Sequence, residues 1–119
     1  MIKLLISGDL MSKSNSRIMT HRNGSPRLIK KQKALEYIDS SILQLKSQLR
    51  SHRTFTEPVY LHIIVYYSSK RPDLDISLIQ DILEKVGVYK NDRLVYEIKA
   101  YKKFDKNNPR CEIEVDLIK

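Results

Sequence analysis

The amino-acid sequence predicts a single α+β domain in which a small mixed β-sheet packs with two main helices. Three observations predict this fold class. The chain has 119 residues, which is the size of one domain, so we expect residues 1–119 to share one core. Apolar residues recur at helical spacing in two segments. They alternate at strand spacing in others, and the two kinds of segment follow each other along the chain.

The N-terminal region is expected to contain a strand and a basic turn. Residues 1–6 are apolar and predict a short strand. Residues 17–30 flank an Asn-Gly dipeptide, the strongest short signal for a hairpin turn, because both residues tolerate positive φ. This segment is therefore predicted to be a basic hairpin or an ordered loop. In an alternative interpretation, Ser25 is a helix cap and Pro26 begins the next helix early.

A long helix and a long strand are expected in the middle of the chain. From about Lys31 to Arg50, apolar residues recur every three or four positions, which predicts an amphipathic helix. Residues 59–66 then alternate with a period of two, which predicts a strand. The second face of this strand is also largely apolar, so we expect it to be central and covered on both sides.

The second half of the chain predicts a shorter helix and two more strands. Residues 76–86 have helical spacing, with Asp75 available as a cap before them and Gly87 placed to end the helix. Residues 94–101 and 111–117 alternate again and are joined by a polar loop. We expect the last strand to show one face to solvent.

Charge is the first feature that indicates function. The chain carries 22 Lys or Arg against 14 Asp or Glu, a formal net charge of +8, which predicts a polyanionic partner, most often nucleic acid. Residues 1–60 hold eleven basic and four acidic residues, whereas residues 61–119 hold eleven and ten. The excess is therefore concentrated in the first half, while the second half keeps acids that a simple DNA clamp would not need.

Composition also excludes several classes of protein. A hydrophobic content of 41% excludes a disordered tail, and the lack of an apolar run near 18 residues excludes a membrane span. The single cysteine, Cys111, excludes an intrachain disulfide framework and a Cys-based zinc site. No signal peptide is visible, so we expect a cytoplasmic protein. Only three glycines are present and none forms a phosphate-binding loop, so we expect no nucleotide cofactor.

The predicted phosphate-contact residues lie before and at the start of the long helix, and beside the acidic segment. They are Arg17, Arg22, Arg27, Lys30, Lys31, Lys33, Lys70 and Arg71. Contacts of this kind give affinity and position rather than sequence reading.

Three carboxylates are the candidate catalytic and metal-ligating residues. Asp73 and Asp75 lie between the central strand and the second helix, and Asp92 follows that helix. Hard divalent ions such as Mg²⁺ take oxygen ligands and are commonly bound through one or two carboxylates. A helix of about eleven residues rises roughly 16 Å. Asp92 can therefore meet the pair only if the chain returns along the helix or if two copies combine. The alternative is that Asp-x-Asp before a helix is simply an N-cap.

The segment Lys70-Arg71-Pro72-Asp73-Leu74-Asp75, the short helix ending at Gly87, and Asn91-Asp92-Arg93-Leu94-Val95 resemble the RusA family of Holliday-junction resolvases. The loop Ser12-Lys13-Ser14-Asn15 is similar too, so the resemblance covers nearly the whole chain. It implies a RusA-like fold and a homodimeric, Mg²⁺-dependent endonuclease, with Mn²⁺ as a substitute ion. Such an enzyme nicks two opposed strands of branched, four-way DNA. On this resemblance Asp73, Asp75 and Asp92 are the three catalytic aspartates, in a bacterial cytoplasm or the host cytoplasm of a phage.

The sequence departs from the family pattern in ways that keep alternatives open. The catalytic lysine of the family helix has no counterpart between Ile76 and Glu84, so Lys70 or Lys90 would have to replace it. A non-catalytic DNA-binding or junction-binding protein of the same fold is therefore one alternative. Another is a restriction-type nuclease, because Pro72-Asp73 and Glu97-Ile98-Lys99 spell its Pro-Asp…Glu-x-Lys pattern.

Overall fold

The computed structural model describes residues 1–12, 17–22 and 24–119, and for residues 17–22 and 25–30 it describes the backbone alone. The elements follow in the order β1 (Ile2–Ser7), β2 (Arg17–Arg22), β3 (Ser25–Lys30), α1 (Gln32–Gln48), β4 (Val59–Tyr67), α2 (Ser77–Lys85), η1 (Asp92–Leu94), β5 (Val95–Phe104) and β6 (Arg110–Leu117). This succession confirms the α+β class and the predicted order of strands and helices.

The main sheet combines antiparallel and parallel pairs in the order β1-β6-β4-β5. Strand β6 runs antiparallel to β1 and β4, whereas β4 and β5 are parallel. A parallel pair needs a crossover connection, and α2 with the segments around it provides one. The carboxyl ends of β4 and β5 therefore meet at one end of the sheet, where Tyr67 lies opposite Phe104.

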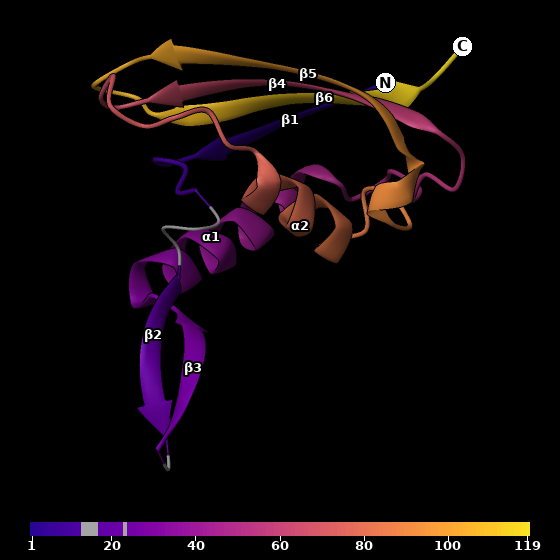
Figure 1. Ribbon diagram of the computed structural model, residues 1–119. Coiled ribbons are helices and arrows are strands. Elements are labelled where there is room, and N and C mark those ends of the chain that lie inside the picture. Colours follow the sequence, from indigo (N-terminus) through magenta and orange to yellow (C-terminus); the bar gives the residue numbers. More distant parts are fainter. Residues whose placement is uncertain (13–16, 23) are drawn as a thin grey trace.

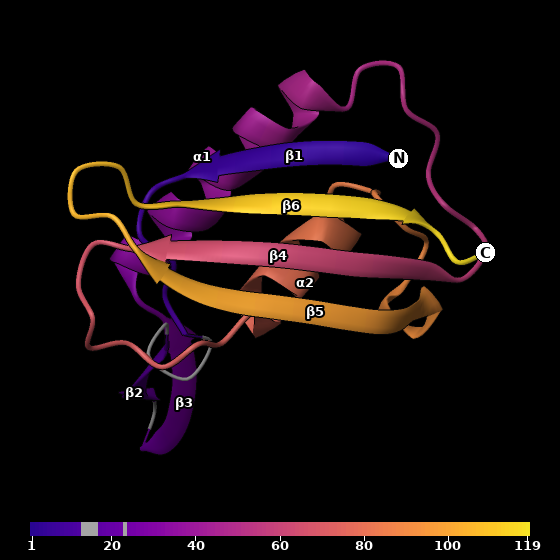
Figure 2. The ribbon, with the colours of Figure 1, turned by 90° about the horizontal axis from the view of Figure 1, so that it is seen from above.

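Both helices lie on the same face of this sheet (Figures 1 and 2). The β4 residues that point toward them, Leu61, Ile63 and Val65, are fully buried. They form one core cluster with Leu45 of α1 and with buried apolar residues of α2. The core therefore has two layers, and no described helix or strand covers the far side of the sheet.

The expectation that β4 is covered on both sides was wrong for the described residues. Strand β4 is central, as predicted, but Tyr60, His62, Ile64 and Tyr66 on its second face are only half-buried. Several side chains on this face have polar tips that stay near water. The Tyr60 hydroxyl donates to Glu114 Oε2 over 2.7 Å, for example. Tyrosine and histidine combine an apolar body with a polar tip, which is why the sequence pattern looked more apolar than the surface is.

Helix α1 closes the free edge of β1 through two glutamines one turn apart. The side chain of Gln48 accepts from the Leu5 main-chain N–H and donates to the Leu5 carbonyl oxygen, both over 2.8 Å. Gln44 does the same for Ser7, over 2.8 and 3.4 Å. The outward main-chain groups of an edge strand are thereby paired within the chain.

Helix α2 ends where Gly87 was expected to end it. Gly87 has φ +83°, and the main-chain N–H of Val88 donates to Leu83 O while that of Gly87 donates to Glu84 O. This is the Schellman arrangement, in which a left-handed residue satisfies the last helical carbonyls. None of the helices in the described ranges is long and apolar enough to span a membrane.

The basic segment forms a hairpin, as predicted. Strands β2 and β3 pair antiparallel from Arg17 opposite Lys30 to Arg22 opposite Ser25. The alternative in which Pro26 begins a helix is wrong, because residues 25–30 form a strand and α1 starts at Gln32. The hairpin extends away from the sheet, beyond α1 (Figure 1).

Candidate functional site

The loop of residues 68–76 leads from the carboxyl end of β4 to α2 and carries Asp73 and Asp75. Tyr67, at the end of β4, is 2% exposed, and its hydroxyl donates to the main-chain oxygen of Asp73 over 3.2 Å. Burial raises the pKa of Tyr67, so the hydroxyl keeps its proton and remains a donor. The core thus holds the backbone at Asp73, while the Asp73 side chain is exposed.

Asp75 lies one residue before Ile76, which is the N-cap residue of α2, so Asp75 is not itself the N-cap that was considered as an alternative. Its Oδ1 accepts from the main-chain N–H of Ser77 over 3.0 Å, in the first turn of α2. This contact orients the carboxylate and the start of the helix together. It is compatible with binding a cation, because a carboxylate offers about four lone-pair sites.

Strand β5 brings a lysine to this loop that sequence reasoning missed. The Nζ atom of Lys102 donates to the Lys70 carbonyl oxygen over 3.0 Å, and Lys70 Nζ lies 5.5 Å from the centre of the Phe104 ring. Lys102 and Phe104 share the face of β5 that points to the helix side, since they lie opposite Val65 and Tyr67. The alternation of β5 was visible in the sequence, but its parallel pairing with β4 was not.

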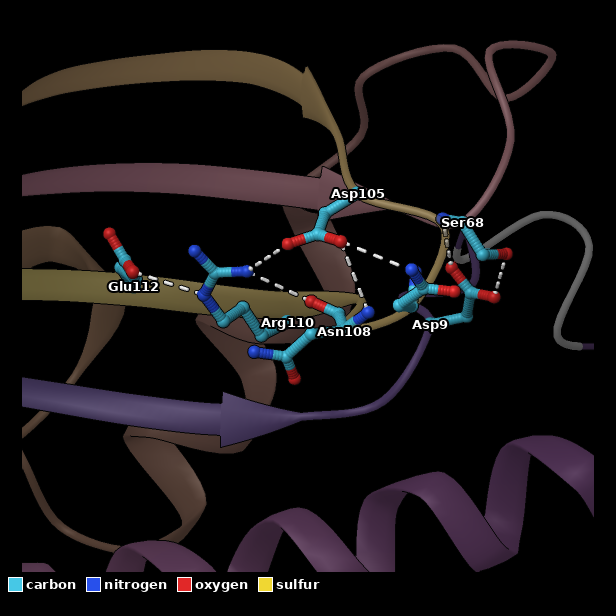
Figure 3. Close-up of polar contacts among 7 residues, drawn as sticks. Asp9, Ser68, Asp105, Asn108, Arg110 and Glu112 are labelled. Atoms are coloured by element: carbon cyan, nitrogen blue, oxygen red, sulfur yellow. Dashed lines mark hydrogen bonds and ion pairs between the residues drawn. The ribbon is translucent and has the colours of Figure 1, made fainter.

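Two polar clusters hold the surrounding loops (Figure 3). Asp9, after β1, accepts from the main-chain N–H of Ser68 over 2.9 Å and also from its hydroxyl, which joins the loop after β1 to the aspartate loop. Arg110, at the start of β6, donates to Asp105 over 2.9 Å and to Glu112 over 3.1 Å. The hydrogen bond from Arg110 holds the pKa of Asp105 below its ordinary value. These contacts rigidify the end of the sheet that carries the loop.

Asp92 lies at the other end of α2, in η1. Its carboxylate lies near that of Glu84, and the pKa of Glu84 is raised, first by desolvation and then by the Asp92 charge. Tyr89 is buried, and its hydroxyl donates to Gln80 O over 3.0 Å. Its pKa is raised by burial and by the charges of Asp92 and Glu84.

The three predicted aspartates are therefore not gathered within one chain. Across the ranges that the structure describes, no group of three or more His, Cys, Asp or Glu side chains is placed to hold a metal ion. Asp73 and Asp75 share one loop, whereas Asp92 has Glu84 as its neighbour. The chain does not return along α2 far enough to unite them.

The two lysines considered as replacements for the helix lysine lie in different places. Lys70 is exposed in the aspartate loop itself. Lys90 is exposed between α2 and η1, where its main-chain N–H donates to Phe55 O over 2.9 Å. Of the two, Lys70 is therefore the neighbour of Asp73.

The restriction-type pattern is not assembled. Glu97 lies opposite Tyr60 near the start of β4, whereas Asp73 follows the end of that strand. In addition, Glu97 Oε2 lies 3.1 Å from His62 Nε2 on the open face of the sheet, away from the helices. The two halves of the Pro-Asp…Glu-x-Lys pattern therefore point to different surfaces.

The predicted phosphate-contact residues divide into two groups. Lys31 and Lys33 lie at the start of α1, and Lys70 and Arg71 are exposed beside Asp73. The remaining four are on the hairpin, where their side chains lie outside the described residues: Arg17, Arg22, Arg27 and Lys30. Contact of the whole set with phosphates stays a prediction.

A family model described as Endodeoxyribonuclease RusA matches residues 8–116 of the 119 residues. The matched region includes the basic hairpin, both helices, the aspartate loop and η1. No curated protein matches the chain.

Proposed function

Since the chain belongs to the RusA endodeoxyribonuclease family and is a Holliday-junction resolvase, we propose that it acts as a Mg²⁺-dependent homodimer that nicks two opposed strands of a four-way junction. The observation that carries this proposal is the loop 68–76. It presents the exposed Asp73 together with Asp75 beside Lys70, Arg71 and Lys102. Carboxylates in a phosphate-binding surface repel the DNA unless a cation neutralises them, so this combination favours metal-assisted hydrolysis over simple binding.

The donor set of this loop fits a hard divalent cation. Asp73 and Asp75 supply carboxylate oxygens, and Mg²⁺ is usually held by one or two carboxylates, with water and phosphate oxygens filling its other positions. Mn²⁺ suits the same oxygen ligands. When bound, such an ion lowers the pKa of a coordinated water and offsets charge on the scissile phosphate.

The side chains around the loop have distinct supporting roles. Lys70 and Arg71 bind the phosphates on either side of the cleaved bond, while Lys102 holds the main chain at Lys70. Tyr67 fixes the backbone at Asp73. Because the rate of hydrolysis depends on the position of the carboxylate relative to the phosphate, these contacts act on the reaction through geometry.

We assign Asp92 to a site shared between two copies, because it does not join Asp73 and Asp75 within one chain. Asp92 of one protomer then completes the carboxylate pair of the other. A dimer also explains paired nicks, since two-fold symmetry places two equivalent sites on two opposed strands.

The proposal is tested by nicking of a mobile four-way junction in Mg²⁺ by the parent protein and by Asp73→Asn. We expect the variant to lose at least about a hundredfold in nicking rate, because a neutral amide is a poorer ligand for Mg²⁺. Asp39→Asn, an exposed change of the same charge on α1, is the matched control and should nick as the parent does. Equal cleavage by Asp73→Asn would remove the site assignment. No cleavage by the parent in Mg²⁺ or Mn²⁺ would favour the binding-only alternative.

The shared site is tested by complementation. Asp73→Asn and Asp92→Asn are expressed together, so that mixed dimers form. In a mixed dimer with shared sites, one site carries both substitutions and the other carries neither, so nicking should reappear. If each site belonged to one chain, both sites of the mixed dimer would be defective, and the mixture would stay as inactive as either variant alone.

A further inference from the structure

The two outer strands of the sheet differ in how their free edges are covered. The edge of β1 is closed by α1, whose Gln44 and Gln48 pair with its main chain. Strand β5 is the other outer strand, and no element in the described ranges pairs with its outer edge. Ten residues of open edge present a row of main-chain donors and acceptors that another strand can use.

Large apolar side chains are exposed along the whole length of β5. The exposed fractions are 71% for Tyr96, 45% for Ile98, 54% for Tyr101 and 47% for Phe104. Continuous apolar exposure of this kind marks an interaction surface rather than a solvated strand. Strand β5 also carries Lys99, Lys102 and Lys103. Their charges oppose pairing in any register that sets lysine against lysine, so charge restricts the registers in which a second strand can pair.

Symmetry restricts the ways in which two copies of β5 can pair. Two residues that lie directly opposite each other in neighbouring strands point to the same face of the sheet. A two-fold axis between two copies of β5 therefore passes between one residue and the same residue of the second copy. Moving the axis by one residue changes the partner of every residue by two positions. Only axes at Lys99 or Ala100 pair nine of the ten residues of β5. An axis at Lys99 sets that lysine against its own copy, which is unfavourable.

The axis at Ala100 gives complementary pairs instead. Glu97 then lies opposite Lys103 of the second copy, and Lys99 lies opposite its Tyr101, all on the open face of the sheet. On the helix face, Ile98 lies opposite Lys102 of the second copy. No like charges are directly opposed in this register, and pairing nine residues forms about eight to ten main-chain hydrogen bonds.

We propose that β5 is the dimer interface and pairs antiparallel with β5 of a second copy about a two-fold axis at Ala100, making one eight-stranded sheet. The occupant is a second copy because, in this register, Glu97 of each β5 lies opposite Lys103 of the other and no like charges are opposed. This inference rests on the homodimer of the proposed function and names the surface that forms it.

The same pairing explains how Asp92 can reach a partner's site. Asp92 lies in η1, directly before β5, and the loop with Asp73 contacts the end of β5 through Lys70 and Phe104. Antiparallel pairing sets the start of one β5 beside the end of the other. Asp92 of each copy is thereby carried toward the aspartate loop of its partner.

The first test is a disulfide at the axis in Ala100→Cys. Directly opposed Cα atoms in antiparallel strands are about 4.5 or 5.5 Å apart, within the range of about 4.4–6.8 Å that a disulfide spans. The native Cys111 is buried, so it does not compete. We expect mild oxidation to give a covalent dimer on non-reducing gels.

Lys106→Cys is the matched control, since it is exposed but lies beyond the end of β5. Its two copies would be roughly 40 Å apart at about 3.3 Å per residue, so no disulfide should form. Absence of the Ala100→Cys disulfide, or equal oxidation of both variants, would overturn the interface. A dimer that packs through the open face of β4 would give this negative result, because Ala100 faces the helix side.

The second test is a charge exchange across the pairs between Glu97 and Lys103. Glu97→Lys should raise the dimer dissociation constant at least about tenfold in sedimentation experiments, because lysines then meet at both symmetry-related positions. The double variant with Lys103→Glu should return to within about threefold of the parent. Glu57→Lys, the same charge change at an exposed position outside β5, should leave dimerisation unchanged.

Failure of the charge exchange to rescue dimerisation would contradict the register. These experiments measure association and need no nicking, so their failure is separate from failure of the proposed function. An inactive protein that forms the Ala100→Cys disulfide would retain the interface and lose the catalytic proposal.

Discussion

Removing one hydroxyl at the end of β4 tests whether the core positions the aspartate loop. In Tyr67→Phe the hydrogen bond to the Asp73 carbonyl oxygen is lost, while the ring stays in the core. A net hydrogen bond contributes about 1 kcal/mol to stability, which for a chain of this length lowers Tm by about 4 °C. The effect on nicking should be larger, roughly tenfold, because a small displacement of a catalytic group costs more in rate than in stability.

The comparison is made by urea denaturation and by nicking of a four-way junction. Tyr60→Phe is the matched control, because it removes a hydroxyl that donates to Glu114 over 2.7 Å on the open face, away from the loop. We expect it to lose similar stability and to keep nicking. If Tyr67→Phe nicks as fast as the parent, or if the two variants lose nicking equally, the reasoning about the loop is refuted.

Three further predictions concern stability and DNA binding. Gly87→Ala should cost about 1–2 kcal/mol, because φ is +83° and the added Cβ meets only ordinary contact with Thr54, so the cost is backbone strain. A loss above about 4 kcal/mol in thermal unfolding would point to a clash instead. Arg110 lowers the pKa of Asp105, so this pair adds stability above the ordinary aspartate pKa and loses it as pH falls through the lowered value. The difference in unfolding free energy between the parent and Arg110→Ala should therefore shrink from pH 6 to pH 2, and a constant difference would contradict the assignment. If six phosphates are neutralised, log affinity for a junction should fall against log salt with a slope of about −5, and a slope shallower than about −2 would reject the basic set.

Local patterns in the sequence were enough to predict the elements. The 3-4 spacing from Lys31 to Arg50 and the alternation of residues 59–66 record which positions face a core, and the structure forms α1 and β4 there. Gly87 was predictable because only a residue that tolerates positive φ ends a helix in this way. The RusA family was also predicted from the sequence, because the motifs that resemble it are short and continuous in the chain. The match of the family model confirms this prediction.

Spatial neighbours were harder to predict. Lys102 lies next to Lys70 only because β5 pairs in parallel with β4, and nothing in the alternation of a strand states its partner. Asp92 was grouped with Asp73 and Asp75 from residue type, yet within one chain its carboxylate meets Glu84. The apolar second face of β4 was expected to be covered, but apolar content does not state what covers it.

The amino-acid sequence by itself determined the helices and strands, the basic charge of the first half and the residue types of the site, because each depends on periodicity or composition over a few neighbouring residues. The tertiary structure decided which strand ends meet, which edge of the sheet stays open and which carboxylates share a loop. These depend on the packing of segments that are far apart in the chain, where the free energy belongs to the whole core and to no single segment.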